Sequence, residues 1–183
     1  APLLGPNVAL ALAATLGDKE LAGRAFKVAA AGFGVALGIA VAVGVGYPDQ
    51  LVSPEILSRT VVSYSDILLA LASGVAGALA LTSGMPSALI GVMVAVALLP
   101  PFVAFGMLFG AGRLEQAWGA FLLLLVNLVS VNVASIATFL LQGIQPRTWW
   151  EANQARKAVR WSLAAWIGLL VLLGVLITVS QPT

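Results

Sequence analysis

Long apolar runs, separated by short polar or turn-forming segments, divide this chain into six candidate helices. The runs cover about residues 1–17, 28–47, 66–82, 87–110, 115–142 and 158–180. Most approach the ~20 residues that a helix needs to cross a bilayer. They do not alternate between polar and apolar residues, as barrel strands would. The pattern therefore predicts an all-α membrane protein with six transmembrane helices, forming a single transmembrane domain over residues 1–183.

The connections between these runs carry most of the polar residues. Residues 18–27, 48–65 and 143–157 read as polar connections, and Gly112–Arg113 as a short one. No charge occurs in the 46 residues between Asp66 and Arg113, which is too long for one helix. The sequence Ser83-Gly84-Met85-Pro86 predicts a turn inside that stretch.

The basic residues predict an orientation if each run crosses once. Seven of the nine fall on connections 17–27, 82–87 and 143–160, and two fall on the other side. Cytoplasmic loops are enriched in Lys and Arg, so we expect basic loops 17–27 and 143–160 in the cytoplasm of a prokaryote, with the C-terminus outside its inner membrane. Four residues in or beside the last loop are candidate topology anchors or lipid-headgroup contacts: Arg147, Arg156, Lys157 and Arg160.

The composition narrows the function. Charged residues make up 9% and hydrophobic residues 61%, with mean hydropathy +1.05, which excludes an ordinary soluble domain. Cys and His are both 0, which removes disulfides, thiolate clusters, His-based proton transfer and haem held by axial His. We therefore expect no enzyme, no cofactor and no metal. The basic residues lie at membrane borders, so we expect no nucleic-acid partner.

A repeat lies within the apolar sequence. When residues 3–27 are aligned with residues 98–122, ten of 25 positions are identical, including Pro6 with Pro101, Gly17 with Gly112 and Glu20 with Glu115. Three crossings separate the two segments, so the repeat would have inverted topology. Its halves are residues 1–47 and 66–142, and 158–180 is an additional C-terminal helix. The first half lacks a counterpart of the 66–82 helix, so we expect the natural protein to extend before Ala1.

Several sequence fragments resemble one family of prokaryotic membrane proteins, the domain of unknown function 389. Among them are Ala1-Pro2-Leu3-Leu4-Gly5-Pro6, Pro54-Glu55-Ile56-Leu57-Ser58-Arg59-Thr60, Ser87-Ala88-Leu89-Ile90-Gly91-Val92 and Val96-Ala97-Leu98-Leu99-Pro100-Pro101. Asn127 and Gly143 with Pro146-Arg147 complete the similarity, which covers about residues 1–147. The resemblance implies a helix before Ala1 and often a cytoplasmic domain before that. It implies no activity.

Prolines and amides inside the apolar runs are the candidate binding residues. Pro lacks an N–H, so Pro6 and Pro100-Pro101 should loosen hydrogen bonds and break their helices inside the membrane. In inverted-repeat transporters, such breaks form sites for ions or polar solutes. The candidates for binding are Pro6, Asn7, Pro100, Pro101, Asn127 and Ser130. The alternatives are a structural kink and ordinary interhelical hydrogen bonds.

No charged residue is expected deep within a span. Asp66 and Glu115 begin helices, where a carboxylate suits the helix dipole, so each is a capping residue or part of a vestibule. Residues 54–60 predict a short outer helix capped by Ser53. This helix is expected to lie along the membrane or to cover a cavity. Glu55 and Arg59 are spaced to pair on it, and both are candidate vestibule or capping residues.

Small residues recur every four positions on two of the runs. Ala30, Gly34, Gly38, Ala42 and Gly46 form one stripe, and Ala70, Gly74 and Ala78 form another. Such stripes let helix backbones approach closely, within a chain or between subunits, and we expect a homo-oligomer.

Two functions follow from these features. The first is a transporter or channel for a small ion or polar solute at antiparallel broken helices. The second is a non-transporting scaffold or sensor subunit of a larger assembly, which the small-residue stripes and the lack of deep charge favour.

Overall fold

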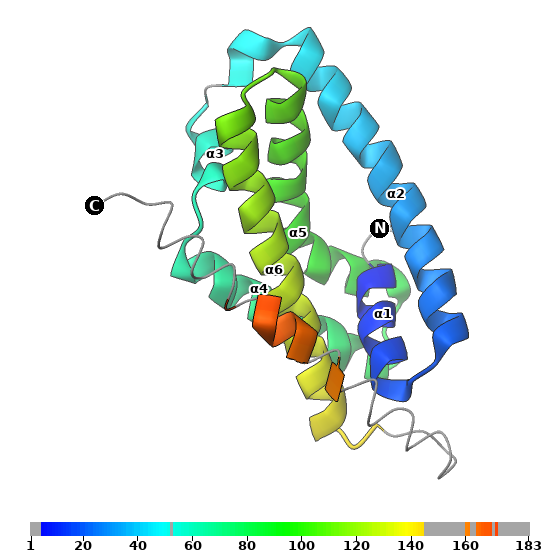
Figure 1. Cartoon of the computed structure of the whole chain (residues 1–183). Coiled ribbons are helices and arrows are strands. Elements are labelled where there is room, and N and C mark those ends of the chain that lie inside the picture. Colours follow the sequence, from blue (N-terminus) through cyan, green and yellow to red (C-terminus); the bar gives the residue numbers. More distant parts are fainter. Residues whose placement is uncertain (1–4, 52, 145–159, 162–163, 170, 172–183) are drawn as a thin grey trace.

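The computed structural model describes residues 5–51, 53–144, 160–161, 164–169 and 171. All regular structure in these ranges is helical, as predicted. The elements are α1 (Gly5–Leu16), α2 (Lys19–Gly46), η1 (Pro48–Leu51), α3 (Pro54–Leu57), η2 (Ser58–Thr60), α4 (Tyr64–Thr82), α5 (Ser87–Gly110) and α6 (Leu114–Leu141). Figure 1 shows α2, α5 and α6 as the long elements of the bundle, with α1 and α4 packed beside their lower halves.

Four of these helices are long and apolar enough to cross a membrane: α2, α4, α5 and α6. The predicted run 87–110 coincides with α5, and the runs 66–82 and 115–142 match α4 and α6 within two residues. The described part of α1 has 12 residues, or about 18 Å against a hydrocarbon core of about 30 Å. The sixth run lies mostly outside the described residues, although residues 160–161, 164–169 and 171 are helical.

The prediction of a basic loop over residues 17–27 is wrong for most of its length. Only Gly17 and Asp18 lie outside a helix, and Lys19 already begins α2. Lys, Glu and Arg are good helix formers, and the Asp18 side chain caps this end by accepting from the backbone N–H groups of Glu20 and Leu21, both at 2.9 Å. The charged residues therefore extend the helix past the apolar run.

α2 and α6 correspond closely in sequence position. Both have 28 residues, and each bound of α6 lies 95 positions after that of α2, the offset of the sequence repeat. The preceding turns also correspond: Gly17 and Gly112 have φ values of 69° and 73°. In each turn the following residue donates back to the helix before it, Asp18 to Ala13 at 3.0 Å and Arg113 to Leu108 at 2.9 Å. In Figure 1, α2 ascends and α6 descends.

The two prolines in α5 bend the helix without interrupting it. Pro100 and Pro101 lie inside a helix that is continuous from Ser87 to Gly110. Figure 1 shows α5 changing direction near its middle. The expectation of a broken helix at this position is therefore replaced by a kink, the usual consequence of interior Pro.

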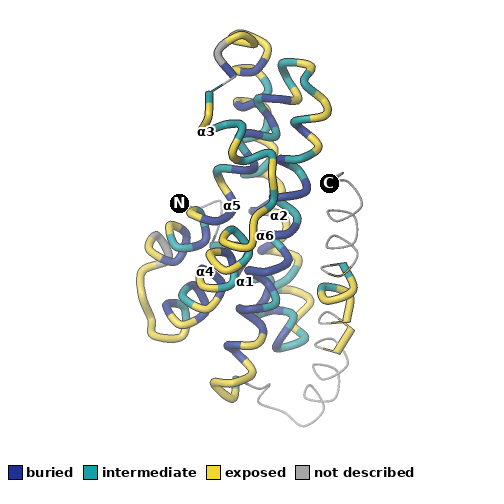
Figure 2. Tube along the Cα trace, turned by 90° about the vertical axis from the view of Figure 1, so that its left-hand side faces the viewer, coloured by how far each residue is buried: buried dark blue, intermediate teal, exposed yellow. Residues whose placement is uncertain are grey.

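α6 is the central helix of the bundle. Figure 2 shows the buried residues gathered along the middle of the molecule, and 15 residues of α6 are buried. α4 packs closely on α6, because a Cβ on Gly74 would lie 2.5 Å from the carbonyl oxygen of Val131. Ala70 and Ala78 are fully buried in the same core, so this predicted small-residue stripe packs within the chain.

The stripe on α2 points away from the described bundle. Ala30, Gly34, Gly38, Ala42 and Gly46 are exposed. The buried face of α2 instead carries Ala29, Ala40 and Gly44, and a Cβ on Gly44 would lie 2.0 Å from the carbonyl oxygen of Met107.

Candidate functional site

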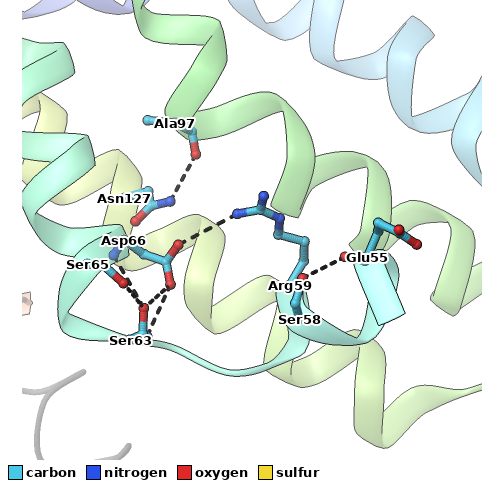
Figure 3. A network of polar contacts seen from close by, with 8 residues as sticks. All are labelled: Glu55, Ser58, Arg59, Ser63, Ser65, Asp66, Ala97 and Asn127. Atoms are coloured by element: carbon cyan, nitrogen blue, oxygen red, sulfur yellow. Dashed lines mark hydrogen bonds and ion pairs between the residues drawn. The ribbon is translucent and has the colours of Figure 1, made fainter. Parts of the chain in front are cut away.

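The bend of α5 is held by a side chain from α6. In a regular helix the carbonyl of Ala97 would accept from the N–H of residue 101, but Pro101 has none. The Nδ2 atom of Asn127 takes that place and donates to the Ala97 carbonyl at 2.9 Å (Figure 3). Asn127 therefore satisfies a backbone acceptor that the proline leaves without its helical partner.

This arrangement leaves the other half of the Asn127 amide unsatisfied. The Ala97 carbonyl can only accept, so the amide must present its NH₂ group there, and its oxygen faces elsewhere. Asn127 is 3% exposed, and Oδ1 has no hydrogen-bond partner among the described residues. A buried acceptor without a donor is costly, by about 1–3 kcal/mol. The bend thus holds an acceptor available to a ligand.

Asp66 lies at the level of this bend. α4 begins about halfway along α6 in Figure 1, and Ile67 packs against the cluster formed by Leu122, Val126 and Val129. Val126 is the immediate neighbour of Asn127. Asp66 thus lies in the first turn of its own helix, as predicted, but beside the middle of α6, because the chain from α3 descends along α6 before α4 starts.

Asp66 caps α4, as predicted. Its Oδ2 atom accepts from the backbone N–H of Ser63 at 3.2 Å and from the Ser63 hydroxyl at 2.6 Å, and Ser63 Oγ accepts from the backbone N–H of Asp66 at 3.4 Å. This reciprocal pair is a capping box. The other carboxylate oxygen, Oδ1, lies 3.6 Å from Nη1 of Arg59. Figure 3 shows the Arg59 guanidinium extending toward Asp66, beside the Asn127 amide.

Arg59 therefore pairs with Asp66 instead of with Glu55. The predicted Glu55–Arg59 pair required one continuous α-helix over 54–60. The segment is instead α3 followed by the 3-10 turn η2, whose tighter winding moves the two side chains off a common face. The predicted cap is present, since Ser53 Oγ accepts from the backbone N–H of Ile56 at 3.4 Å.

A second amide contact joins α1 to α6. Asn132 Nδ2 donates to Asn7 Oδ1 at 3.2 Å and to the Leu128 carbonyl at 2.8 Å. Asn7 is 5% exposed, and Asn132 is 4% exposed. Pro6 is the second described residue of α1, and the prediction that it breaks a helix depends on residues before Gly5, which lie outside the described ones. The structure therefore brings Asn7 to Asn132, whereas Asn127 faces α5.

The remaining predicted residues lie outside this cluster. The Ser130 hydroxyl donates to the Val126 carbonyl of its own helix at 2.8 Å. Glu115 is exposed in the first turn of α6, and Glu55 is exposed on α3. Arg160 is exposed, while Arg147, Arg156 and Lys157 lie outside the described residues. Within the described ranges, no three His, Cys, Asp or Glu side chains group as metal ligands.

The sequence analysis missed two groups of this cluster, the Ala97 carbonyl and Ser63. The first had a usable signal, because Ala97 lies four residues before Pro101 and must lose its helical donor. Ser63 also had one, since Ser followed three residues later by Asp resembles a capping box. The contact between Asn132 and Asn7 spans 125 residues and had no local signal.

These features define the class of protein: its described residues form helices only, and four of these helices are long and apolar enough to span a membrane. The particular family follows from comparison: a family model described as a domain of unknown function (DUF389) matches residues 1–133, and the chain belongs to that family. It is also 39% identical over 177 residues to an uncharacterized protein of Methanocaldococcus jannaschii. The match covers 97% of this chain and 55% of the archaeal protein, so the chain spans about half of that relative. No solved structure matches.

Proposed function

We propose that this chain is the membrane part of a transporter or channel for a small ion or polar solute, with its site at the bend of α5. The observation that carries the proposal is the buried Asn127 amide, whose oxygen has no partner among the described residues, beside two helix-bending prolines. Buried polar groups in membrane helices are costly, and their retention marks functional positions.

The proposed architecture is an inverted repeat. The equal lengths of α2 and α6, their common offset of 95 residues, and the matching turns at Gly17 and Gly112 support this relation. Their opposite directions in Figure 1 are those of inverted halves. In such folds, bent or interrupted helices from the two halves provide a site near the bilayer midplane, and rocking of one half against the other exposes it alternately.

The proposed membrane placement retains six crossings in the inner membrane of a prokaryote. The first turns of α2, with Lys19, Arg24 and Lys27, would face the cytoplasm, and the turn at Arg113 would face outward. Arg147, Arg156, Lys157 and Arg160 would then contact cytoplasmic lipid headgroups, with the C-terminus outside.

A flux screen in proteoliposomes tests the function. The full-length protein would be compared with Asn127→Ala and with Thr138→Val, which removes a buried hydroxyl of α6 that bonds only its own helix, to the Ala134 carbonyl at 2.8 Å. We expect flux of at least one ion or small polar solute, lost in Asn127→Ala and retained in Thr138→Val. Equal flux in all three variants, or none above empty vesicles, would contradict the proposal.

One observation favours the second function, a non-transporting scaffold or sensor subunit. The small-residue stripe of α2 is exposed, and a Cβ at Gly34 or Gly38 would meet nothing within 4 Å. Such a face suits close packing with a second helix, including that of another copy of this chain. Oligomerisation that Gly34→Leu disrupts, together with a negative flux screen, would favour this function.

A further inference from the structure

We propose that the bend of α5 binds a monovalent cation with Asn127 Oδ1 and the carboxylate of Asp66 as ligands, and that Arg59 is the counter-ion of Asp66 in the unloaded state. The proposal deepens the proposed function, on whose site it rests, by naming the class of ligand. It concerns equilibrium binding, so it can be tested independently of flux.

The unpaired atom, Asn127 Oδ1, can bind only a cation or a hydrogen-bond donor. Asn127 Oδ1 is an acceptor, and the NH₂ group of the same amide is committed to the Ala97 carbonyl at 2.9 Å. Pro100 also removes the N–H that would bond the Val96 carbonyl within α5. Asn127 Oδ1 is therefore an oxygen without a partner at the bend, and oxygens are the ligands of alkali and other hard cations.

Asp66 provides the negative charge. Its Oδ2 atom accepts hydrogen bonds from Ser63. Its Oδ1 atom lies 3.6 Å from Nη1 of Arg59, which is longer than a normal hydrogen bond. That oxygen therefore keeps lone pairs for another ligand. The Asp66 side chain is 16% exposed, so its charge is largely removed from water and needs a counter-ion.

Arg59 has the properties of a displaceable counter-ion. Its side chain is 41% exposed, and it extends from the short turn η2 instead of from a long packed helix. Binding a cation while Arg59 remains would add a positive charge to a poorly solvated place, which is costly. If the cation replaces Arg59 at Asp66, the local charge is unchanged. This exchange also explains why one carboxylate suffices for a monovalent ion, whereas divalent ions usually need more.

Sodium-dependent stability of the purified full-length protein in detergent tests the site. Thermal unfolding would be followed in NaCl and in N-methyl-D-glucamine chloride at equal ionic strength. We expect NaCl to raise the midpoint by about 3–6 °C at ten times the dissociation constant. The same midpoint in both salts over the whole titration, with KCl and LiCl giving no rise either, would overturn the proposal.

Two substitutions should move sodium binding in opposite directions. Asp66→Asn keeps an oxygen for the Ser63 cap but removes the charge, and we expect the sodium-dependent rise to disappear. Arg59→Gln removes the competing cation, and we expect the dissociation constant to fall about tenfold, equivalent to about 1.4 kcal/mol. The matched control is Arg24→Gln, which removes an arginine from the exposed Glu20–Arg24 pair on α2 and should change nothing.

Tighter sodium binding in Arg59→Gln is a result that a purely structural ion pair would not give. If Arg59→Gln weakens or abolishes the sodium effect, the exchange is wrong. If sodium has no effect but a neutral solute crosses vesicles, the cation site fails and the transport function stands. If sodium binds but nothing crosses, the site stands and transport fails.

Discussion

The side-chain amide of Asn127 donates to the carbonyl of Ala97 at 2.9 Å, where a regular helix would use the N–H of residue 101. Pro101 and Asn127 are 26 positions apart on different helices, yet one supplies what the other lacks. A kink inside a membrane leaves a carbonyl that no water can satisfy, so a neighbouring helix must provide the donor. The bend of α5 and the polarity of α6 are therefore one feature.

This relation predicts a strong coupling between Asn127 and Pro101. Asn127→Leu should destabilise the protein by about 1–3 kcal/mol, because the Ala97 carbonyl loses its donor. In a Pro101→Ala background, the restored backbone N–H can bond Ala97, and the cost of Asn127→Leu should fall by at least half. Unfolding in detergent of the two single variants and the double variant measures this coupling. Additive costs would show that Asn127 does not serve the proline.

The contact between Asn7 and Asn132 predicts that a double substitution costs less stability than a single one. Asn132→Leu alone should cost about 1–3 kcal/mol, since it leaves the Asn7 amide without its donor. Replacing both amides by Leu should recover most of that loss, because no unpaired group remains in an apolar contact. If the double variant is less stable than Asn132→Leu in the same unfolding measurement, the two amides do more than satisfy each other's hydrogen bonds, and this prediction is wrong.

The sequence predicted the helices well where the run of apolar residues ends at a strong stop signal. Gly17 and Gly112 marked helix ends, and Ser83–Pro86 marked a turn that the structure places between α4 and α5. It failed at the start of α2, because charge was taken as a sign of a loop although Lys and Glu favour helix. Asn127 was predicted as a site residue, but not its partner.

The depth of Asp66 could not be predicted from the chain alone. Position in the sequence shows that Asp66 begins a helix, but not that this helix starts halfway along another. That level follows from the packing of Ile67 on the Val126 cluster, a contact between residues far apart in the chain. The pairing of Arg59 likewise depends on where α3 tightens into η2.

Two glycines on α2 should respond very differently to the same substitution. A Cβ on Gly44 would lie 2.0 Å from the Met107 carbonyl oxygen, whereas a Cβ on Gly38 would meet nothing within 4 Å. Gly44→Ala should separate α2 from α5 at a cost of about 1–3 kcal/mol or more. Gly38→Ala should be neutral or slightly stabilising, since Ala is the better helix former by about 1 kcal/mol. Thermal unfolding of the Gly44→Ala and Gly38→Ala variants measures this difference, and equal losses of stability would contradict it.

Side-specific labelling tests the proposed topology, because residues 1–183 contain no Cys that would compete for the label. Asp18 and Arg113 occupy equivalent turns, before α2 and α6, which run in opposite directions in Figure 1. If these helices are related by an inverted repeat, the two turns lie on opposite faces of the membrane. A membrane-impermeant maleimide added to intact cells should label Arg113→Cys, whereas Asp18→Cys should require permeabilised cells. Arg160→Cys should behave like Asp18→Cys if the last predicted run crosses outward. Labelling of Asp18→Cys and Arg113→Cys from the same side would exclude the inverted relation, whatever the similarity of their turns.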